Sequence, residues 1–141
     1  MKTTVTKPWY IFTPYRENLQ QALCDLQRQE FREHRYDPYG ILASEEIVPT
    51  SIAALRNIMD VCGTATVIDL LYISDCPDYC SACPLTRRRL ISLFGTDQPT
   101  RRMIEGNSRY LAGIKRGQGC YIIAYKDGEP DEILFAGRSF D

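Results

Sequence analysis

Three cysteines close together in the chain offer the first candidate chemistry. Cys76, Cys80 and Cys83 follow a C-x3-C-x2-C spacing within a segment that reads as a loop. Thiolates grouped in one loop can hold zinc or an iron–sulfur cluster, so one interpretation is a metal or redox site. The other is that Cys83 and Cys76 pack as small apolar side chains and that the protein needs no cofactor. A closed zinc site would need a fourth ligand from a distant position: Cys24, Cys62, Cys120 or His34.

Five arginines at two expected helix beginnings are the second candidate. Arg87, Arg88 and Arg89 open one helix, and Arg101 and Arg102 open the next. Cations there oppose the helix dipole, which favours anions at that end by about 0.3–1 kcal/mol. Guanidinium groups beside free backbone N–H groups can bind a phosphate or a carboxylate. The alternative is a solvated face whose arginines pair with carboxylates of the acidic C-terminal stretch.

A glutamate and the chain's only histidine form the third candidate. Glu30 and His34 are one helical turn apart at the end of an expected helix. A carboxylate in that position can orient the imidazole and raise its pKa, which suits an acid–base pair. The alternative is a local hydrogen-bonded closure at the edge of the core. A further carboxylate, Asp69, lies in an apolar stretch and fits either a catalytic group or a strand-end charge.

The N-terminal half must position these residues with two helices and two strands. A short run of aromatic and β-branched residues predicts a strand at 9–12, and an apolar stripe at helical spacing predicts a helix from about 15 to 35. Residues 36–49 read as a loop. Thr50 or Ser51 can cap a second helix that ends near Gly63. A β-branched run at 67–73 predicts another strand.

The C-terminal half reads as two helices followed by a hairpin. Thr86 and Gly95 are expected to cap one helix, and Pro99 suits the first turn of the next. Glycines within that second helix predict an interruption or close packing, and its expected buried side is Met103, Tyr110, Leu111 and Ile114. Apolar runs at 120–125 and 133–136 flank Asp127-Gly128, which predicts a β-hairpin.

Together these elements predict one α+β domain over residues 1–141. Its small mixed or antiparallel sheet would contain the N-terminal strand, the Val67 strand and the C-terminal hairpin, packed with about four helices. The composition is ordinary for a globular protein, with 44% hydrophobic and 25% charged residues. No apolar run approaches membrane-spanning length, and six cysteines without a secretion signal indicate reduced thiols. We therefore expect a cytoplasmic protein without a membrane partner.

Two segments carry a resemblance to other proteins. Glu30-Phe-Arg-Glu-His-Arg-Tyr-Asp-Pro38, and Tyr125-Lys-Asp-Gly-Glu-Pro-Asp-Glu-Ile-Leu-Phe-Ala-Gly-Arg-Ser-Phe-Asp141, resemble segments of a group of small uncharacterised bacterial proteins. The resemblance implies a bacterial single-domain protein. It implies no activity, cofactor or catalytic residue.

The sequence favours a small non-catalytic binding module, such as an adaptor or an immunity-like protein. Its partner would be a protein or an anionic ligand, acidic or phosphate-bearing, held by the arginines at the two helix beginnings. The net charge of −1 gives no general attraction to nucleic acid, so a nucleic-acid partner is not favoured. The alternatives that stay open are the metal or redox protein and, more weakly, a small enzyme that uses Glu30 and His34.

Overall fold

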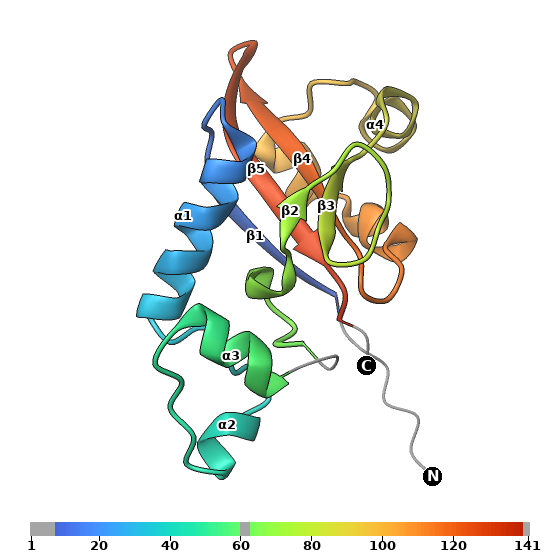
Figure 1. The fold of residues 1–141 in the computed structure, drawn as a ribbon. Coiled ribbons are helices and arrows are strands. Elements are labelled where there is room, and N and C mark those ends of the chain that lie inside the picture. Colours follow the sequence, from blue (N-terminus) through green and yellow to red (C-terminus); the bar gives the residue numbers. More distant parts are fainter. Residues whose placement is uncertain (1–7, 60–62, 140–141) are drawn as a thin grey trace, which may run out of the picture.

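The computed structural model describes residues 8–59 and 63–139 of the chain. Its centre is a five-stranded sheet in the order β1-β5-β4-β3-β2 (Figure 1). The β1, β5 and β4 strands are antiparallel, whereas β3 lies parallel to both β4 and β2. This mixed sheet with its helices confirms the predicted α+β fold. The strands are β1 (Trp9–Pro14), β2 (Tyr72–Ile73), β3 (Ser81–Pro84), β4 (Gly119–Lys126) and β5 (Glu129–Gly137).

The predicted C-terminal hairpin is formed by β4 and β5. Asp127 and Gly128 both have positive φ angles, 52° and 79°, which is the backbone that a two-residue type I′ turn requires. Side chains of β4 alternate between the two faces of the sheet, as the sequence predicted. Tyr121 packs with the cluster on one face, and Ile122 packs with the cluster on the other.

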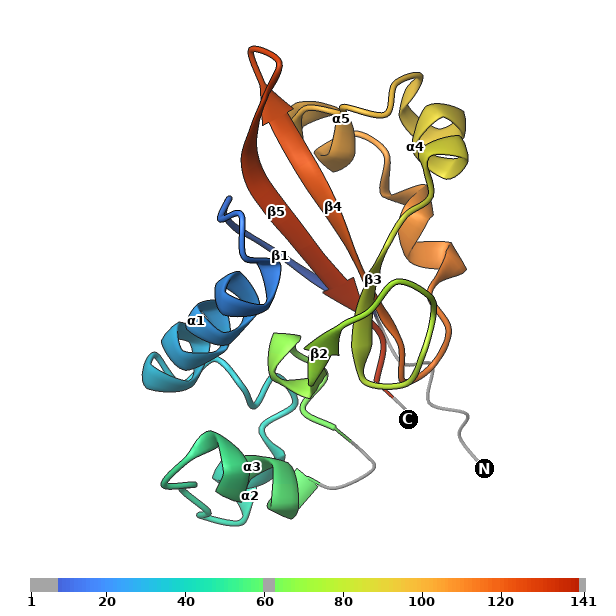
Figure 2. The same ribbon diagram turned by 45° about the horizontal axis from the view of Figure 1, so that its top comes forward.

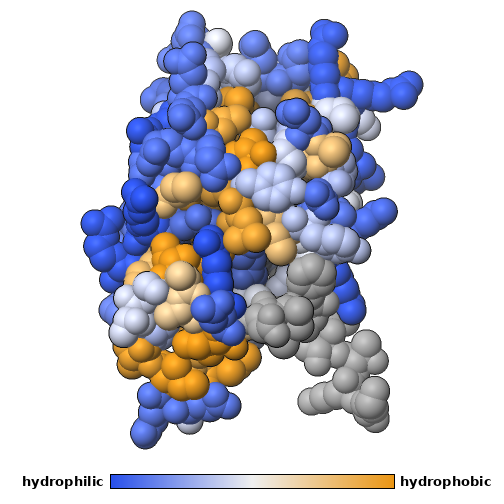
Figure 3. Space-filling view, in the orientation of Figure 1, coloured by the Kyte–Doolittle hydropathy of each residue, from blue (hydrophilic) through white to orange (hydrophobic). Residues whose placement is uncertain are grey.

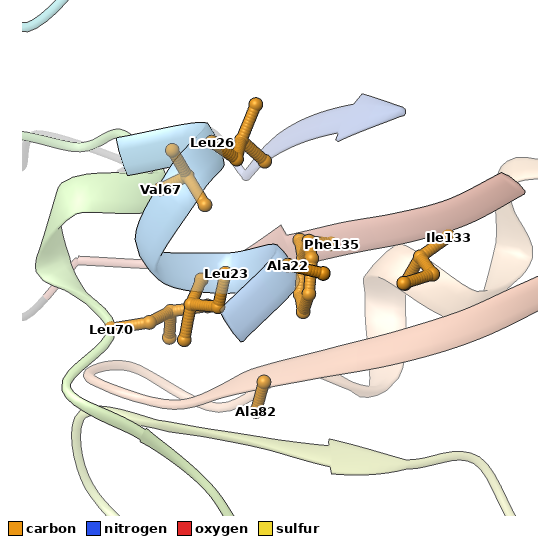
Figure 4. Close-up of a cluster of buried hydrophobic side chains, with 8 residues drawn as sticks. All are labelled: Ala22, Leu23, Leu26, Val67, Leu70, Ala82, Ile133 and Phe135. Carbon is orange, nitrogen blue, oxygen red and sulfur yellow. The ribbon is translucent and has the colours of Figure 1, made fainter. Parts of the chain in front are cut away.

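Helix α1 (Leu19–Arg32) covers the first face of the sheet. Its apolar side packs with Phe135 and other buried residues in the cluster drawn in Figure 4. The helix is shorter than the predicted 15–35. It begins after Asn18, whose side chain accepts a hydrogen bond from the Gln21 N–H. It ends at Arg32, so His34 lies beyond it with a positive φ of 59°.

The predicted strand at 67–73 is wrong for its first part. Val67–Asp69 form a 3-10 turn, η2, and only the two residues of β2 extend. Local hydrogen bonds explain the difference. The Thr66 side chain accepts from the Ile68 N–H, and the buried Gln27 amide donates to the carbonyls of Val67 and Leu70. Val67 and Ile68 are buried as expected, but the hydrogen bonds of their backbone belong to the 3-10 turn.

Short helices cover the second face of the sheet (Figure 2). Helix α4 (Arg87–Phe94) has the predicted caps, because the Thr86 side chain accepts from the Arg89 N–H and Gly95 is left-handed. The next helix is interrupted, as predicted, into α5 (Arg101–Glu105) and the 3-10 helix η3 (Ser108–Gly113). Tyr110 and Ile114 are buried as expected, whereas Met103 is 45% exposed because α5 turns its neighbour Ile104 into the core instead.

A smaller layer, α2 (Ile41–Ser44) and α3 (Ile52–Met59), packs beside η2. The predicted loop at 36–49 therefore contains a helical turn. Ser51 caps α3 as expected, with its Oγ 3.0 Å from the Ala54 N–H, while Cys62 lies outside the described residues. Apolar side chains gather on the surface over α2 and α3 (Figure 3). Among the described residues, no helix is long and apolar enough to cross a membrane.

Candidate functional site

A pocket of about 220 Å³ lies where β1 begins and β5 ends, bordered by α3 and η2. It is smaller than the roughly 300–1,000 Å³ of common ligand pockets, so it suits a compact metabolite. We call it the Trp9 pocket. Its wall contains Trp9, Arg56, Met59, Gly63, Thr64, Asp69, Leu70, Leu71, Cys80, Gly117, Gln118, Arg138 and Ser139.

The indole of Trp9 lies against β5 because the residue opposite it is a glycine. Trp9 and Gly137 are direct partners in the β1–β5 register, and a Cβ atom at Gly137 would overlap the indole ring. The ring nitrogen Nε1 is buried, and it has no hydrogen-bond partner among the described residues. A buried donor without a partner costs roughly 1–3 kcal/mol.

Arg56 supplies a half-buried positive charge to the same wall. Its Nε and Nη2 atoms donate to the Ile68 carbonyl at 3.1 Å, and Nη2 also lies 3.3 Å from the Leu70 carbonyl. These bonds fix the guanidinium against η2. Among the described residues, no carboxylate lies within 4.0 Å of it and Nη1 has no partner. Burial lowers the pKa of Arg56, an effect that the nearby Asp69 charge partly opposes.

Asp69 supplies a half-buried carboxylate. Its Oδ1 accepts from the Thr64 N–H at 2.5 Å and from the Thr64 hydroxyl at 2.9 Å, and Oδ2 accepts from the Ala65 N–H at 2.9 Å. Burial raises the pKa of Asp69, although these hydrogen bonds act in the opposite direction. No cation lies within 4.0 Å of this carboxylate in the part of the chain that the structure describes. A Cβ atom at Gly63 would come within 2.7 Å of Oδ2.

Cys80 is the thiol of the wall, and its surroundings do not activate it. Its backbone has a positive φ of 56° and is held at both ends, since its N–H donates to the Gly117 carbonyl and its carbonyl accepts from the Leu71 N–H, each at 2.7 Å. Burial raises the pKa of Cys80. The thiol is therefore protonated at neutral pH and is a weak nucleophile.

The three cysteines of the predicted metal cluster do not converge. Cys80 faces the Trp9 pocket, Cys76 is exposed, and Cys83 is buried on β3 opposite Cys120 of β4. No group of three metal-binding side chains comes together in residues 8–59 and 63–139. The reason is that β3 begins at Ser81, so the last cysteine belongs to a strand and not to the loop. Burial raises the pKa of Cys120 to about 12, so it is an inert core thiol.

Glu30 and His34 do not form the predicted pair. The buried Glu30 carboxylate accepts from Arg35, whose Nε lies 2.8 Å from Oε2. The exposed His34 ring lies near Tyr36 instead, with Nδ1 3.3 Å from the hydroxyl. Helical spacing does not apply to His34 because α1 ends before it. The structure instead shows an ion pair between Glu30 and Arg35 at the edge of the core.

The five arginines are partly neutralised within the protein. Arg87 pairs with Asp97 at 2.9 Å, and Arg101 pairs with Glu105 at 3.1 Å and with Glu132 at 2.8 Å. The three others, Arg88, Arg89 and Arg102, are exposed and have no ion pair among the described residues.

The two arginine groups have different neighbours. Arg101 contacts Glu132 of β5, which is opposite Ala124 of β4. The Arg89 guanidinium lies next to Gly113 of η3. A single binding site formed by all five arginines stays a prediction.

Few features of the sequence indicate the Trp9 pocket. Asp69 is a charge in an apolar run, but Arg56 is an ordinary residue of an amphipathic helix. The single tryptophan, paired across strands with a glycine, was the one signal available, and it needs the β1–β5 register to be recognised. Comparisons with protein-family models, curated proteins and solved structures find no match for this chain. Function must therefore be inferred from the site itself.

Proposed function

We propose that this protein is a non-catalytic binding protein that holds a small organic anion in the Trp9 pocket. The observation that carries the proposal is the Arg56 guanidinium, which is half-buried and has no carboxylate within 4.0 Å among the described residues. Burying a charge without a partner is costly. A bound anion would supply the missing partner.

Two further features support an organic anion. Trp9 adds an aromatic surface to the wall, and Arg56 supplies the guanidinium that a carboxylate would contact. Met59, Leu70 and Leu71 offer apolar surface for a hydrocarbon portion. Ligand pockets commonly combine an apolar wall with a few placed polar groups in this way.

The chemistry of the wall favours binding over catalysis. The Cys80 thiol is protonated, and hydrogen bonds from the 64–65 loop hold the Asp69 carboxylate in place. The anionic ligand expected from the sequence is retained in this proposal, but its binding site moves from the helix beginnings to the pocket. Two of those five arginines already have carboxylate partners within the protein.

Tryptophan fluorescence tests the proposal directly, because Trp9 is the only tryptophan in the chain. Small carboxylates, from acetate to 3-phenylpropionate, are titrated alongside the matching neutral amides. We expect saturable changes with carboxylates of suitable size and at least tenfold weaker binding of their amides, since hydrogen bonds to charged groups contribute about 1.5–3 kcal/mol.

Two variants locate the anion. Arg56→Gln is expected to weaken carboxylate binding at least tenfold, for the same reason. Arg102→Gln, an exposed arginine on the other face of the sheet, is the matched control and should bind like the wild type. No saturable change with any carboxylate, or equal loss in both variants, would contradict the proposal.

A further inference from the structure

We infer that the ligand of the Trp9 pocket is a zwitterion of the α-amino acid class, with its carboxylate on Arg56 and its ammonium group on Asp69. The inference rests on the proposed function of the same pocket. Its basis is that Arg56 and Asp69 border one cavity, and neither has an opposite charge within 4.0 Å in the described part of the chain. Arg138 borders the same cavity, and its guanidinium donates to the carbonyls of Ile114 and Leu111. A ligand with two opposite charges would neutralise both.

Arg56 and Asp69 do not neutralise each other because the backbone holds them apart. The guanidinium is bonded to the carbonyls of Ile68 and Leu70, the residues on either side of Asp69. The carboxylate is bonded to the N–H groups of Thr64 and Ala65. Each charge is thus fixed by a separate set of hydrogen bonds, although each is close enough to affect the other. The pair is a preorganised dipole, and little ordering is required when a ligand binds.

Each charged group retains capacity for a ligand. The Nη1 atom of Arg56 has two N–H donors that find no acceptor in residues 8–59 and 63–139. On Asp69, Oδ2 accepts from the Ala65 N–H, and the Thr66 backbone N–H also stabilises the carboxylate. The missing side chain at Gly63 leaves Oδ2 uncovered on that side, because a Cβ there would lie 2.7 Å from it.

The remaining wall and the volume indicate an apolar side chain on that amino acid. Met59, Leu70 and Leu71 supply hydrocarbon surface, and the indole of Trp9 adds an aromatic one. The cavity of about 220 Å³ corresponds to about seven waters at roughly 30 Å³ each. That space suits a single free amino acid such as leucine or methionine.

Wild-type protein alone can test the inference through Trp9 fluorescence at pH 7. The probes are L-valine, L-leucine, L-methionine and L-phenylalanine, each compared with the acid that lacks its amino group and the amine that lacks its carboxylate. We expect the best amino acid to bind at least tenfold more tightly than its matched acid, and the amine to bind most weakly. An acid that binds as tightly as its amino acid would overturn the inference and leave the anion-binding function intact. No saturable binding of any amino acid or acid would overturn both.

A variant that lacks the Asp69 charge tests whether the ammonium group of the ligand binds to Asp69. In Asp69→Asn, the advantage of the amino acid over its matched acid should disappear, while the acid binds at least as tightly as it does to wild type. Asp131→Asn, an exposed carboxylate of β5, is the control and should keep the advantage. An unchanged advantage in Asp69→Asn would overturn the assignment, and a variant that does not fold leaves the wild-type comparison to decide.

Discussion

The arginine of the Trp9 pocket and those of the helices α4 and α5 differ in how deeply they are buried and in which carboxylates they contact. Arg101 is exposed at the surface, and two carboxylates and the face of Phe12 surround it. Arg56 is half-buried, and no carboxylate lies within 4.0 Å of it among the described residues. The exposed Arg101 thus has two carboxylate partners, whereas the half-buried Arg56 has none among the described residues.

The difference shows that the number of arginines in a segment does not tell which of them lacks a carboxylate partner. Exposed ion pairs contribute little, about 0–1 kcal/mol, because water already solvates both charges. A charge away from water depends much more on its partner. Among the described residues Arg56 has no carboxylate within 4.0 Å, which is why the proposed function is placed on Arg56.

A substitution that displaces the Trp9 indole should have the largest effect on stability and on ligand binding. In Gly137→Val, the new side chain would overlap the indole across the β1–β5 pair, and we expect a loss of about 3 kcal/mol in the free energy of unfolding. The fluorescence response to ligands should also disappear. Urea unfolding measures the first effect and titration the second.

Gly106→Val is the control for steric bulk, because Gly106 is exposed at the end of α5 and its nearest neighbour to an added Cβ is a carbonyl at 3.3 Å. It should keep the ligand response. If Gly137→Val also binds and unfolds like wild type, the indole does not occupy the position that defines the pocket.

The comparison of the two arginines can be sharpened by removing each in turn. Arg56→Gln should reduce the free energy of unfolding by about 2 kcal/mol, because the carbonyls of Ile68 and Leu70 lose their donors. Arg101→Gln should cost less than about 1 kcal/mol, because its ion pairs are exposed. Chemical denaturation of both variants, without ligand, measures the two losses, and an equal loss would show that burial does not distinguish these charges.

The pH dependence of Asp69 should give the smallest effect. Since burial raises its folded-state pKa above the unfolded value of about 3.9, the folded protein binds the proton more tightly. The stability of wild type relative to Asp69→Asn should therefore be highest at low pH and should fall as the pH rises through the folded pKa. Among the described residues, the other charged and titratable groups of the pocket wall are Arg56, Arg138 and Cys80. Arg56 and Cys80 keep their protons from about pH 4.5 to 7.5.

Urea unfolding of both proteins across that pH range measures the difference. A saturating amino acid that binds the wild type should reduce the pH dependence, because its ammonium group would stabilise the ionised carboxylate. A difference in stability that instead grows with pH would mean that hydrogen bonds from the 64–65 loop outweigh burial at Asp69.

Local sequence by itself determined the elements whose causes lie within a few residues. The Asp127-Gly128 turn follows from two residues that tolerate positive φ, and the ends of α4 follow from Thr86 and Gly95. The burial of the 67–70 run also followed from its apolar residues, and so did the α+β class.

Tertiary structure alone decided the backbone of η2 and the composition of the pocket. Gln27 and Arg56 reach η2 from two other helices and take its carbonyls, which no local pattern could indicate. The pocket joins Trp9 to Arg56 and Asp69 only because β1 pairs with the last strand of the chain, opposite Gly137. Whether a charge is left without a partner depends on every segment that packs around it, so only the folded chain shows it.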